Sequence, residues 1–253
     1  MKLNLKNKKV LITGSSKGIG LEIAKDFSKL GNEVFINSRS NKNLITAKKY
    51  INNSNLITCQ ADLSKELGIN KLFKLINSKT EHLDILVCNL GNSTPQNTIG
   101  EEDIKNWQSS INVNLLSAIN TIYHFRKLLK NSSSPSIVCI SSICGVSSLG
   151  APIDYSVAKS ALISFVKNQS RILSIDGIRI NAISPGNIFF KGGTWEKKLK
   201  KNKSKVTKYI KNNVPLKMFG STKHISDMVL FLSSDISSFT TGANIIIDGG
   251  QTA

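Results

Sequence analysis

Arginine, acidic residues, cysteine and long apolar runs are all scarce in this sequence of 253 residues. Only Arg39, Arg126, Arg171 and Arg179 are arginines, so 30 of the 34 basic residues are lysines. Proteins that read DNA sequence rely on arginine forks for base contacts, so this shortage argues against nucleic-acid binding as the main function. Sixteen acidic residues leave a formal net charge of +18, which favours anionic substrates or partners.

The cysteines and the apolar runs exclude two further classes. Cys59, Cys88, Cys139 and Cys144 lack the close pairing of a zinc site and are too few for a disulfide scaffold, so we expect free thiols and no metal. The longest apolar runs, residues 137–140 and 243–247, are far shorter than the ~20 residues of a membrane span. The basic N-terminal stretch lacks an apolar segment and a cleavage site. We therefore expect a cytoplasmic protein without membrane contact.

What the sequence does contain is an alternation of short β-branched runs with longer amphipathic stretches. This pattern is typical of βαβ units and a parallel sheet. Residues 18–30 repeat apolar side chains on one helical face, and Gly31 follows as a C-cap. We predict one α/β domain over residues 1–253, with strands near residues 10–13, 34–37, 56–59, 85–88, 137–141, 179–183 and 244–247.

A glycine-rich stretch stands between the first predicted strand and the first predicted helix. Glycines at this spacing allow a tight turn, close approach of a pyrophosphate, and a helix start whose free N–H groups face the anion. The strand–loop–helix context is the one that a dinucleotide site requires, although a turn without ligand is the alternative. The stretch reads Thr13-Gly14-Ser15-Ser16-Lys17-Gly18-Ile19-Gly20.

The end of the second predicted strand indicates which dinucleotide would bind. Asn37-Ser38-Arg39 contains no acidic residue to hold the ribose 2′-hydroxyl of NAD. A 2′-phosphate would instead meet Arg39 and Lys17. The sequence therefore favours NADP(H) over NAD(H), unless both cations are solvated surface residues.

Three further side chains are candidate catalytic groups. Tyr155 and Lys159 lie four residues apart in an apolar-periodic helical stretch, so they project from one face. We expect a nearby ammonium, together with an oxidised nicotinamide, to lower the pKa of Tyr155 from about 10 and make it a usable acid or base. Ser142 ends the fifth predicted strand, at the edge where open α/β sheets bind ligands.

In their order and spacing these residues resemble the classical short-chain dehydrogenase/reductase family, in particular its members that reduce 3-oxoacyl groups on acyl carrier protein. The resemblance covers essentially the whole chain. It rests also on Asn114, Asp62, residues 88–91, 112–115, 179–186 and 247–250. It implies a single-domain Rossmann fold with a doubly wound, seven-stranded parallel sheet. It also implies hydride transfer between a nicotinamide and a carbonyl or alcohol carbon, and a homotetramer.

The resemblance assigns roles to individual residues. Tyr155 would protonate the carbonyl oxygen and Ser142 would orient the carbonyl. Lys159 would bind the nicotinamide ribose and lower the pKa of Tyr155, while Asn114 would hold a relay water. The cofactor would contact Gly14, Ser16, Lys17, Gly18, Ile19, Gly20, Ser38, Arg39, Asp62, Leu63, Asn89, Gly91, Tyr155, Lys159, Pro185, Gly186 and Ile188. Residues 187–220, here termed the lid segment, would cover the substrate with apolar walls from Phe189, Phe190 and Trp195.

Several of these residues have simpler explanations when taken singly. Asn114 could kink a helix, Ser142 could cap a strand end, and Asp62 could cap a helix through Ser64. The eight lysines between residues 197 and 211 could form a solvated helical face or a positive rim for an anionic substrate.

The chain departs from the family pattern at three places. The family usually has Asn-Asn-Ala-Gly where this chain has Cys88-Asn89-Leu90-Gly91, and often has Thr or Ser soon after Pro-Gly, where residues 187–190 are Asn-Ile-Phe-Phe. Asp176 precedes Gly177, where members acting on acyl-carrier substrates tend to have a basic residue.

We predict an NADPH-dependent reductase of a 3-oxoacyl thioester or of a small or sugar-like ketone. The alternatives are a non-catalytic, cofactor-sensing protein and a nucleic-acid-binding protein. The former typically loses the active-site Tyr or Lys, and this chain keeps both.

Overall fold

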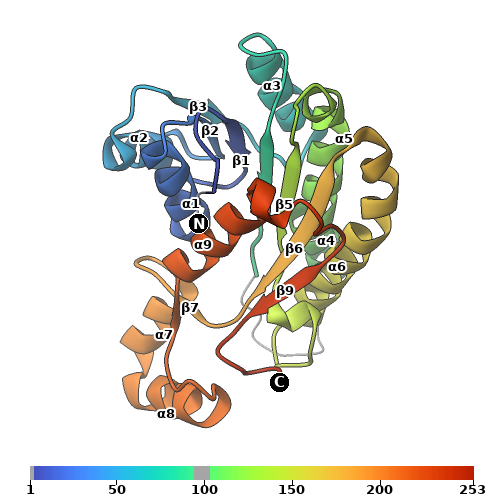
Figure 1. Ribbon diagram of the computed structural model, residues 1–253. Coiled ribbons are helices and arrows are strands. Elements are labelled where there is room, and N and C mark those ends of the chain that lie inside the picture. Colours follow the sequence, from blue (N-terminus) through green and yellow to red (C-terminus); the bar gives the residue numbers. More distant parts are fainter. Residues whose placement is uncertain (1–2, 94–102) are drawn as a thin grey trace.

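A computed structural model describes residues 3–93 and 103–253 of the chain, and strands alternate with helices along it (Figure 1). The first part comprises β1 (Lys9–Ile12), α1 (Gly18–Lys29), β2 (Glu33–Ser38), α2 (Asn41–Ile51), β3 (Leu56–Gln60), α3 (Glu66–Asn77) and β4 (Ile85–Cys88). The middle comprises α4 (Ile104–Ile111), a π-helical turn (Asn112–Leu116), α5 (Ser117–Lys130), β5 (Ser136–Ile140) and α6 (Ile153–Leu173). The last part comprises β6 (Arg179–Pro185), β7 (Ile188–Phe189), α7 (Thr194–Lys201), α8 (Lys203–Asn213), β8 (Gly220–Ser221), α9 (Thr222–Ser233) and β9 (Asn244–Ile247).

Seven parallel strands form one sheet in the order β3-β2-β1-β4-β5-β6-β9. All seven strands predicted from the sequence are present, with ends within two residues of the expected positions. The strand order reverses between β1 and β4, so a crevice opens there at the carboxyl edge of the sheet. This doubly wound Rossmann arrangement confirms the predicted fold class.

Alternating side chains of each strand enter two separate cores. Leu11 of β1 packs on one face of the sheet, with residues of α3, α5 and α6. Its neighbours Val10 and Ile12 pack on the other face, with residues of α1, α2 and α9. Side chains alternate across a strand, so near-continuous apolar strands bury both faces of the sheet, as parallel sheets require.

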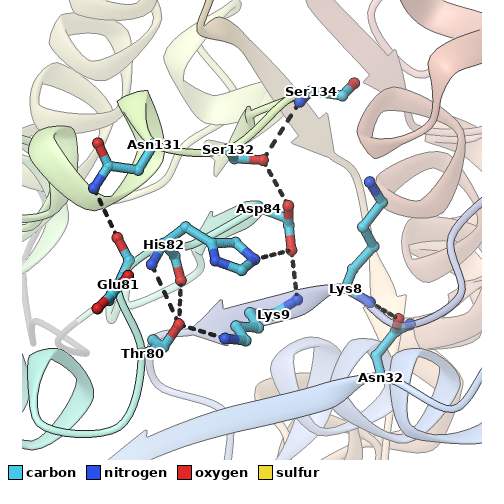
Figure 2. A network of polar contacts seen from close by, with 10 residues as sticks. All are labelled: Lys8, Lys9, Asn32, Thr80, Glu81, His82, Asp84, Asn131, Ser132 and Ser134. Carbon is cyan, nitrogen blue, oxygen red and sulfur yellow. Dashed lines mark hydrogen bonds and ion pairs between the residues drawn. The ribbon is translucent and has the colours of Figure 1, made fainter.

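Polar contacts fasten the amino edge of the sheet, opposite the crevice (Figure 2). Asp84, which precedes β4 and is 4% exposed, accepts hydrogen bonds from the backbone N–H of Lys9 at 2.8 Å and from Ser132 Oγ at 2.5 Å. His82 Nε2 lies 3.6 Å from the same carboxylate. One buried carboxylate thus ties β1 and β4 to the turn that leads into β5.

The lid segment stands apart from the layered part of the molecule, with α7 and α8 at one end (Figure 1). The sequence predicted this segment only as a lid, through the family resemblance. It did not indicate the small parallel sheet in which Ile188 and Phe189 of β7 pair with Gly220 and Ser221 of β8. Two-residue strands carry too little periodicity to be recognised in a sequence. No helix in the described ranges is both long enough and apolar enough to cross a membrane.

Candidate active site

A crevice of about 550 Å³ lies at the carboxyl edge of the sheet. It is lined by most of the residues that the sequence singled out, namely Gly14, Ser16, Lys17, Gly18, Ile19, Ser38, Arg39, Asp62, Leu63, Asn89, Gly91, Ser142, Tyr155, Lys159, Pro185, Gly186, Ile188, Phe190 and Trp195. Gly20, Asn114 and Phe189 do not line it. Segments separated by up to about 180 residues in the chain therefore meet at the predicted place.

The glycine loop turns sharply into α1. Gly14 and Gly18 have φ values of +60° and +58°, a region that residues with a side chain rarely adopt. No side chain caps the start of α1, and its first turn contains no acidic residue. The N–H groups of this helix start are therefore available to an anion, and the helix dipole favours one there.

Asn89, at the end of β4, holds the loop in place. Its amide Nδ2 donates to the carbonyl oxygens of Thr13 and Gly14, each at 3.0 Å. Gly20 is packed closely against the same amide, because a Cβ at this position would lie 2.4 Å from Asn89 Nδ2. Asn89 therefore holds the loop by hydrogen bonds, and Gly20 leaves room for its amide.

The end of β2 forms a polar, cationic corner of the crevice. Ser16 Oγ donates to Ser38 Oγ at 3.0 Å, and Ser38 Oγ accepts from the N–H of Ser40 at 3.2 Å. The exposed side chains of Lys17 and Arg39 line the same corner. The sequence reading missed Ser40 and Asn43, which also line it, although Ser-Asn-Lys-Asn after the strand is a helix-capping signal.

Among the described residues that line the crevice, Asp62 is the only acidic one. Its Oδ1 accepts hydrogen bonds from the backbone N–H and the hydroxyl of Ser64, at 3.1 and 2.7 Å. Asp62 therefore acts as a local cap, as the simpler explanation had it, and it also lines the crevice.

Ser142, Tyr155 and Lys159 come together where β5 ends and α6 begins. Tyr155 is hydrogen-bonded to Ser142. Lys159, 2% exposed, donates from Nζ to the carbonyl oxygen of Ile140 at 2.9 Å, and its Nζ lies 6.0 Å from the centroid of the Tyr155 ring. The four-residue spacing on α6 places both side chains on the crevice face, as the sequence predicted.

Burial is the largest influence on the pKa values of Tyr155 and Lys159. It raises the pKa of Tyr155 to about 12, while the hydrogen bond with Ser142 lowers it and the Cys144 thiol raises it further. Burial also lowers the pKa of Lys159 to about 8, against the opposite influence of Cys139 and Cys88. Lys159 is not among these influences on Tyr155, and its lowering of the Tyr155 pKa beside an oxidised nicotinamide stays a prediction. At neutral pH the phenol keeps its proton.

Asn114 lies behind these residues in the π-helical turn between α4 and α5. The side chain is 1% exposed, and its Nδ2 donates to the carbonyl oxygens of Asn92 and Ser110 while its Oδ1 accepts from the N–H of Asn92. The helical stretch is irregular here, in agreement with the simpler explanation of Asn114 as a helix-kinking residue, and the amide bonds to Ser110 of α4 and to Asn92 after β4. A Cβ on Gly91 would lie 3.2 Å from Asn114 Oδ1 and 2.9 Å from Lys159 Nζ, so a larger residue here would displace the lysine ammonium.

The three lid aromatics have different surroundings. Trp195 lines the crevice, stacks on Tyr209 with ring centroids 5.6 Å apart, and is covered by Lys198. Phe190 lines the crevice next to the glycine loop. Phe189 is 39% exposed and packs against Phe219 outside the crevice.

Comparison with known proteins supports this geometry. Residues 14–252 match the family described as enoyl-(acyl carrier protein) reductase. The chain is 31% identical to 3-oxoacyl-(acyl-carrier-protein) reductase of Aquifex aeolicus, over 99% of this chain and 100% of that one, and 30% identical to glucose 1-dehydrogenase 2 of Bacillus subtilis, over 98% and 96%. L-sorbose reductase of Gluconobacter frateurii, solved with NADPH and L-sorbose, is similar in structure, with a TM-score of 0.91, 27% identity and all of both chains covered. The chain belongs to the classical short-chain dehydrogenase/reductase family of NAD(P)-dependent oxidoreductases.

Proposed function

We propose that this protein is an NADPH-dependent carbonyl reductase, with Asn114, Ser142, Tyr155 and Lys159 as its catalytic group. The observation that carries the proposal is the joint placement of Ser142, Tyr155 and Lys159 in the crevice that also holds the glycine loop. The dinucleotide fits the residues present, because the free helix start of α1 suits a pyrophosphate and the positive φ of Gly14 and Gly18 makes the tight turn before it.

The chemistry divides between cofactor and protein. When bound in the crevice, a nicotinamide would supply or accept the hydride. Tyr155, which holds its proton at neutral pH, donates that proton to the carbonyl oxygen during reduction, and Ser142 holds the same oxygen by a hydrogen bond. Lys159 would bind the nicotinamide ribose, and Asn114 would hold the relay water through which Tyr155 regains its proton.

A preference for NADP(H) is supported by the cationic corner. Arg39 and Lys17 line it together with the hydroxyls of Ser16 and Ser38. A 2′-phosphate would find charge and donors there, whereas the 2′-hydroxyl of NAD would find no carboxylate among the residues described at the end of β2.

The leading substrate class is a 3-oxoacyl thioester, supported by the matched family and by the relative from Aquifex aeolicus. A sugar-like or other small ketone is the second candidate, and Asp176 favours it. This carboxylate pairs with Arg126 at 2.6 Å and Lys130 at 2.9 Å, so it neutralises two basic side chains. Family members that act on acyl-carrier substrates tend to have a basic residue at the position of Asp176. The second candidate also agrees with the substrates named for the glucose and sorbose enzymes.

Further proposals concern the lid segment and the assembly. We propose that the chain is one domain in which residues 187–220 close over substrate, and that Lys197, which lines the crevice, favours anionic substrates.

We also propose a homotetramer, because exposed apolar side chains such as Phe239, Tyr123 and Ile246 mark surfaces suited to contact between copies. A cytoplasmic location agrees with the four free cysteines.

An NADPH-consumption screen of acyl thioesters, keto sugars and small ketones tests the function, with Tyr155→Phe as the matched blank. We expect turnover on at least one carbonyl class and a loss of about a hundredfold or more in the variant, which still binds NADPH. Comparable turnover in the variant would contradict the assignment of Tyr155. Binding of NADPH without turnover on any class would favour a cofactor-sensing protein.

A further inference from the structure

Phe190, directly after β7, is the residue through which the lid segment touches the glycine loop. A Cβ built on Gly18 would lie 2.8 Å from both Cε2 and Cζ of the Phe190 ring, so the ring rests on the backbone of Gly18. The same ring lies close to Gly193, whose N–H donates to the Phe190 carbonyl oxygen at 3.1 Å. Phe190 also packs against the core formed by α1, α2 and α9.

The contact lies beside the helix start that would bind a pyrophosphate. Gly18 is the first residue of α1, and this end of the helix has neither a side-chain cap nor an acidic residue in its first turn. An apolar ring at this point keeps water away from N–H groups that would face the phosphates. Their attraction for the anion is then stronger than in open solvent.

The ring also connects this subsite to the rest of the lid segment. Beyond Phe190 the chain turns at Gly192, which has a φ of +80° and donates its N–H to Glu196 Oε2 at 2.7 Å, and α7 then begins. On the other side of Phe190, β7 is paired to β8. A movement of this segment away from the crevice would therefore lift the ring from Gly18.

We propose that Phe190 is a positioning residue that closes the lid segment over the pyrophosphate subsite and thereby slows release of the dinucleotide. This inference rests on the proposed function and assigns to Phe190 a role distinct from a substrate wall. Phe189 is the matched control, because it has the same side chain one residue earlier but packs against Phe219 and does not line the crevice.

Stopped-flow displacement of NADPH by excess NADP⁺, followed by NADPH fluorescence, measures the release rate directly. We expect Phe190→Ala to release NADPH about tenfold faster with a nearly unchanged association rate, since affinity changes of this kind lie mostly in dissociation. Phe190→Leu keeps an apolar contact on Gly18 and should restore most of the slow release. Phe189→Ala should release NADPH at a rate close to that of the wild type.

Each outcome decides the question. An unchanged release rate in Phe190→Ala, or an equal acceleration in Phe189→Ala, would overturn the role of Phe190 and leave the proposed function intact. Should Phe190→Ala fail to fold by circular dichroism, Phe190→Val takes its place, because its shorter side chain withdraws from Gly18. Release faster than in Phe190→Leu then supports the contact, and release as slow as in the wild type contradicts it. A wild-type protein that does not bind NADPH would overturn both this inference and the proposed function.

Discussion

At the scale of single residues, charge in and around the crevice is set by burial. Lys159 is almost fully buried, and its ammonium donates a hydrogen bond to the neutral carbonyl of Ile140 rather than to a carboxylate, so its charge is poorly compensated. Arg39 is exposed at the rim and keeps its solvation. Substitution of Lys159 should therefore change the stability of the fold, whereas substitution of Arg39 should change the choice of dinucleotide.

The stability of the protein should increase when Lys159 is replaced by Met. The folded-state pKa of Lys159, about 8, lies below its ordinary 10.5, so the charged form destabilises the fold below pH 8 and this effect fades as pH rises to about 10.5. We expect the free energy of unfolding of Lys159→Met to exceed that of the wild type by about 2 kcal/mol at pH 7 and by less near pH 10. We also expect this variant to lose turnover. Urea unfolding at both pH values measures this, with exposed Lys167→Met on the same helix as control. A less stable Lys159→Met at pH 7 would contradict the burial argument.

The choice of dinucleotide should depend on Arg39. Replacing it by Asp puts a carboxylate where a 2′-phosphate would bind, which repels NADPH and suits the 2′-hydroxyl of NADH. We expect the ratio of NADH to NADPH affinity, measured by fluorescence titration, to rise by about a hundredfold, roughly 3 kcal/mol. Arg171→Asp changes the net charge equally at the far end of α6 and should leave the ratio unchanged. If both variants behave alike, the corner at the end of β2 does not select the cofactor.

At the scale of elements, the helix that begins with the glycine loop is fastened to a helix about 200 residues later in the chain. Asp26 of α1, 7% exposed, accepts a hydrogen bond from Ser226 Oγ of α9 at 2.8 Å and lies 3.3 Å from Lys223 Nζ. A capping box formed by Ser221 and His224 starts α9 directly after the lid segment. The position of the phosphate-binding helix start therefore depends on α9.

Removal of this link should destabilise the fold. Asp26→Ala leaves the buried hydroxyl of Ser226 without its partner, and we expect a loss of about 1–3 kcal/mol in urea unfolding. Asp227→Ala removes the other carboxylate that pairs with Lys223, but this one is 56% exposed and should cost less than about 1 kcal/mol. Equal losses in the two variants would show that burial of Asp26 does not matter.

At the scale of the whole molecule, the net charge of +18 and the exposed apolar side chains have different consequences. Phe239 is fully exposed, and Ile246 of β9, the last strand in the sheet order, is 42% exposed. Unpaired sheet edges and apolar patches are sites of association. Lys197 of α7 lines the crevice, and further lysines follow it in α7 and α8.

The proposed homotetramer should sediment with four times the 27.6 kDa mass of one chain. We expect Phe239→Asp, which places charge on an apolar surface, to shift sedimentation toward smaller species. A monomer mass for the wild type at micromolar concentration would contradict the assembly.

The lysines should accelerate capture of an anionic substrate. At saturating NADPH, we expect kcat/KM for an anionic carbonyl substrate to fall several-fold as salt rises from 0.01 to about 0.2 M, because the Debye length shortens from about 30 Å to below 10 Å. A neutral ketone is the control and should change little. Equal responses of the two substrates would remove the steering role from the lysines.

Local signals in the sequence determined the strands, the glycine loop, and the common face of Tyr155 and Lys159. These follow from backbone periodicities of two and 3.6 residues and from the special conformations of glycine, all of which act over a few neighbouring residues. Only the tertiary structure decided that Phe190 rests on Gly18, that Asn114 bonds to Asn92 and Ser110, and that burial raises the pKa of Tyr155. Packing and desolvation act between segments far apart in the chain, so no local pattern contains them.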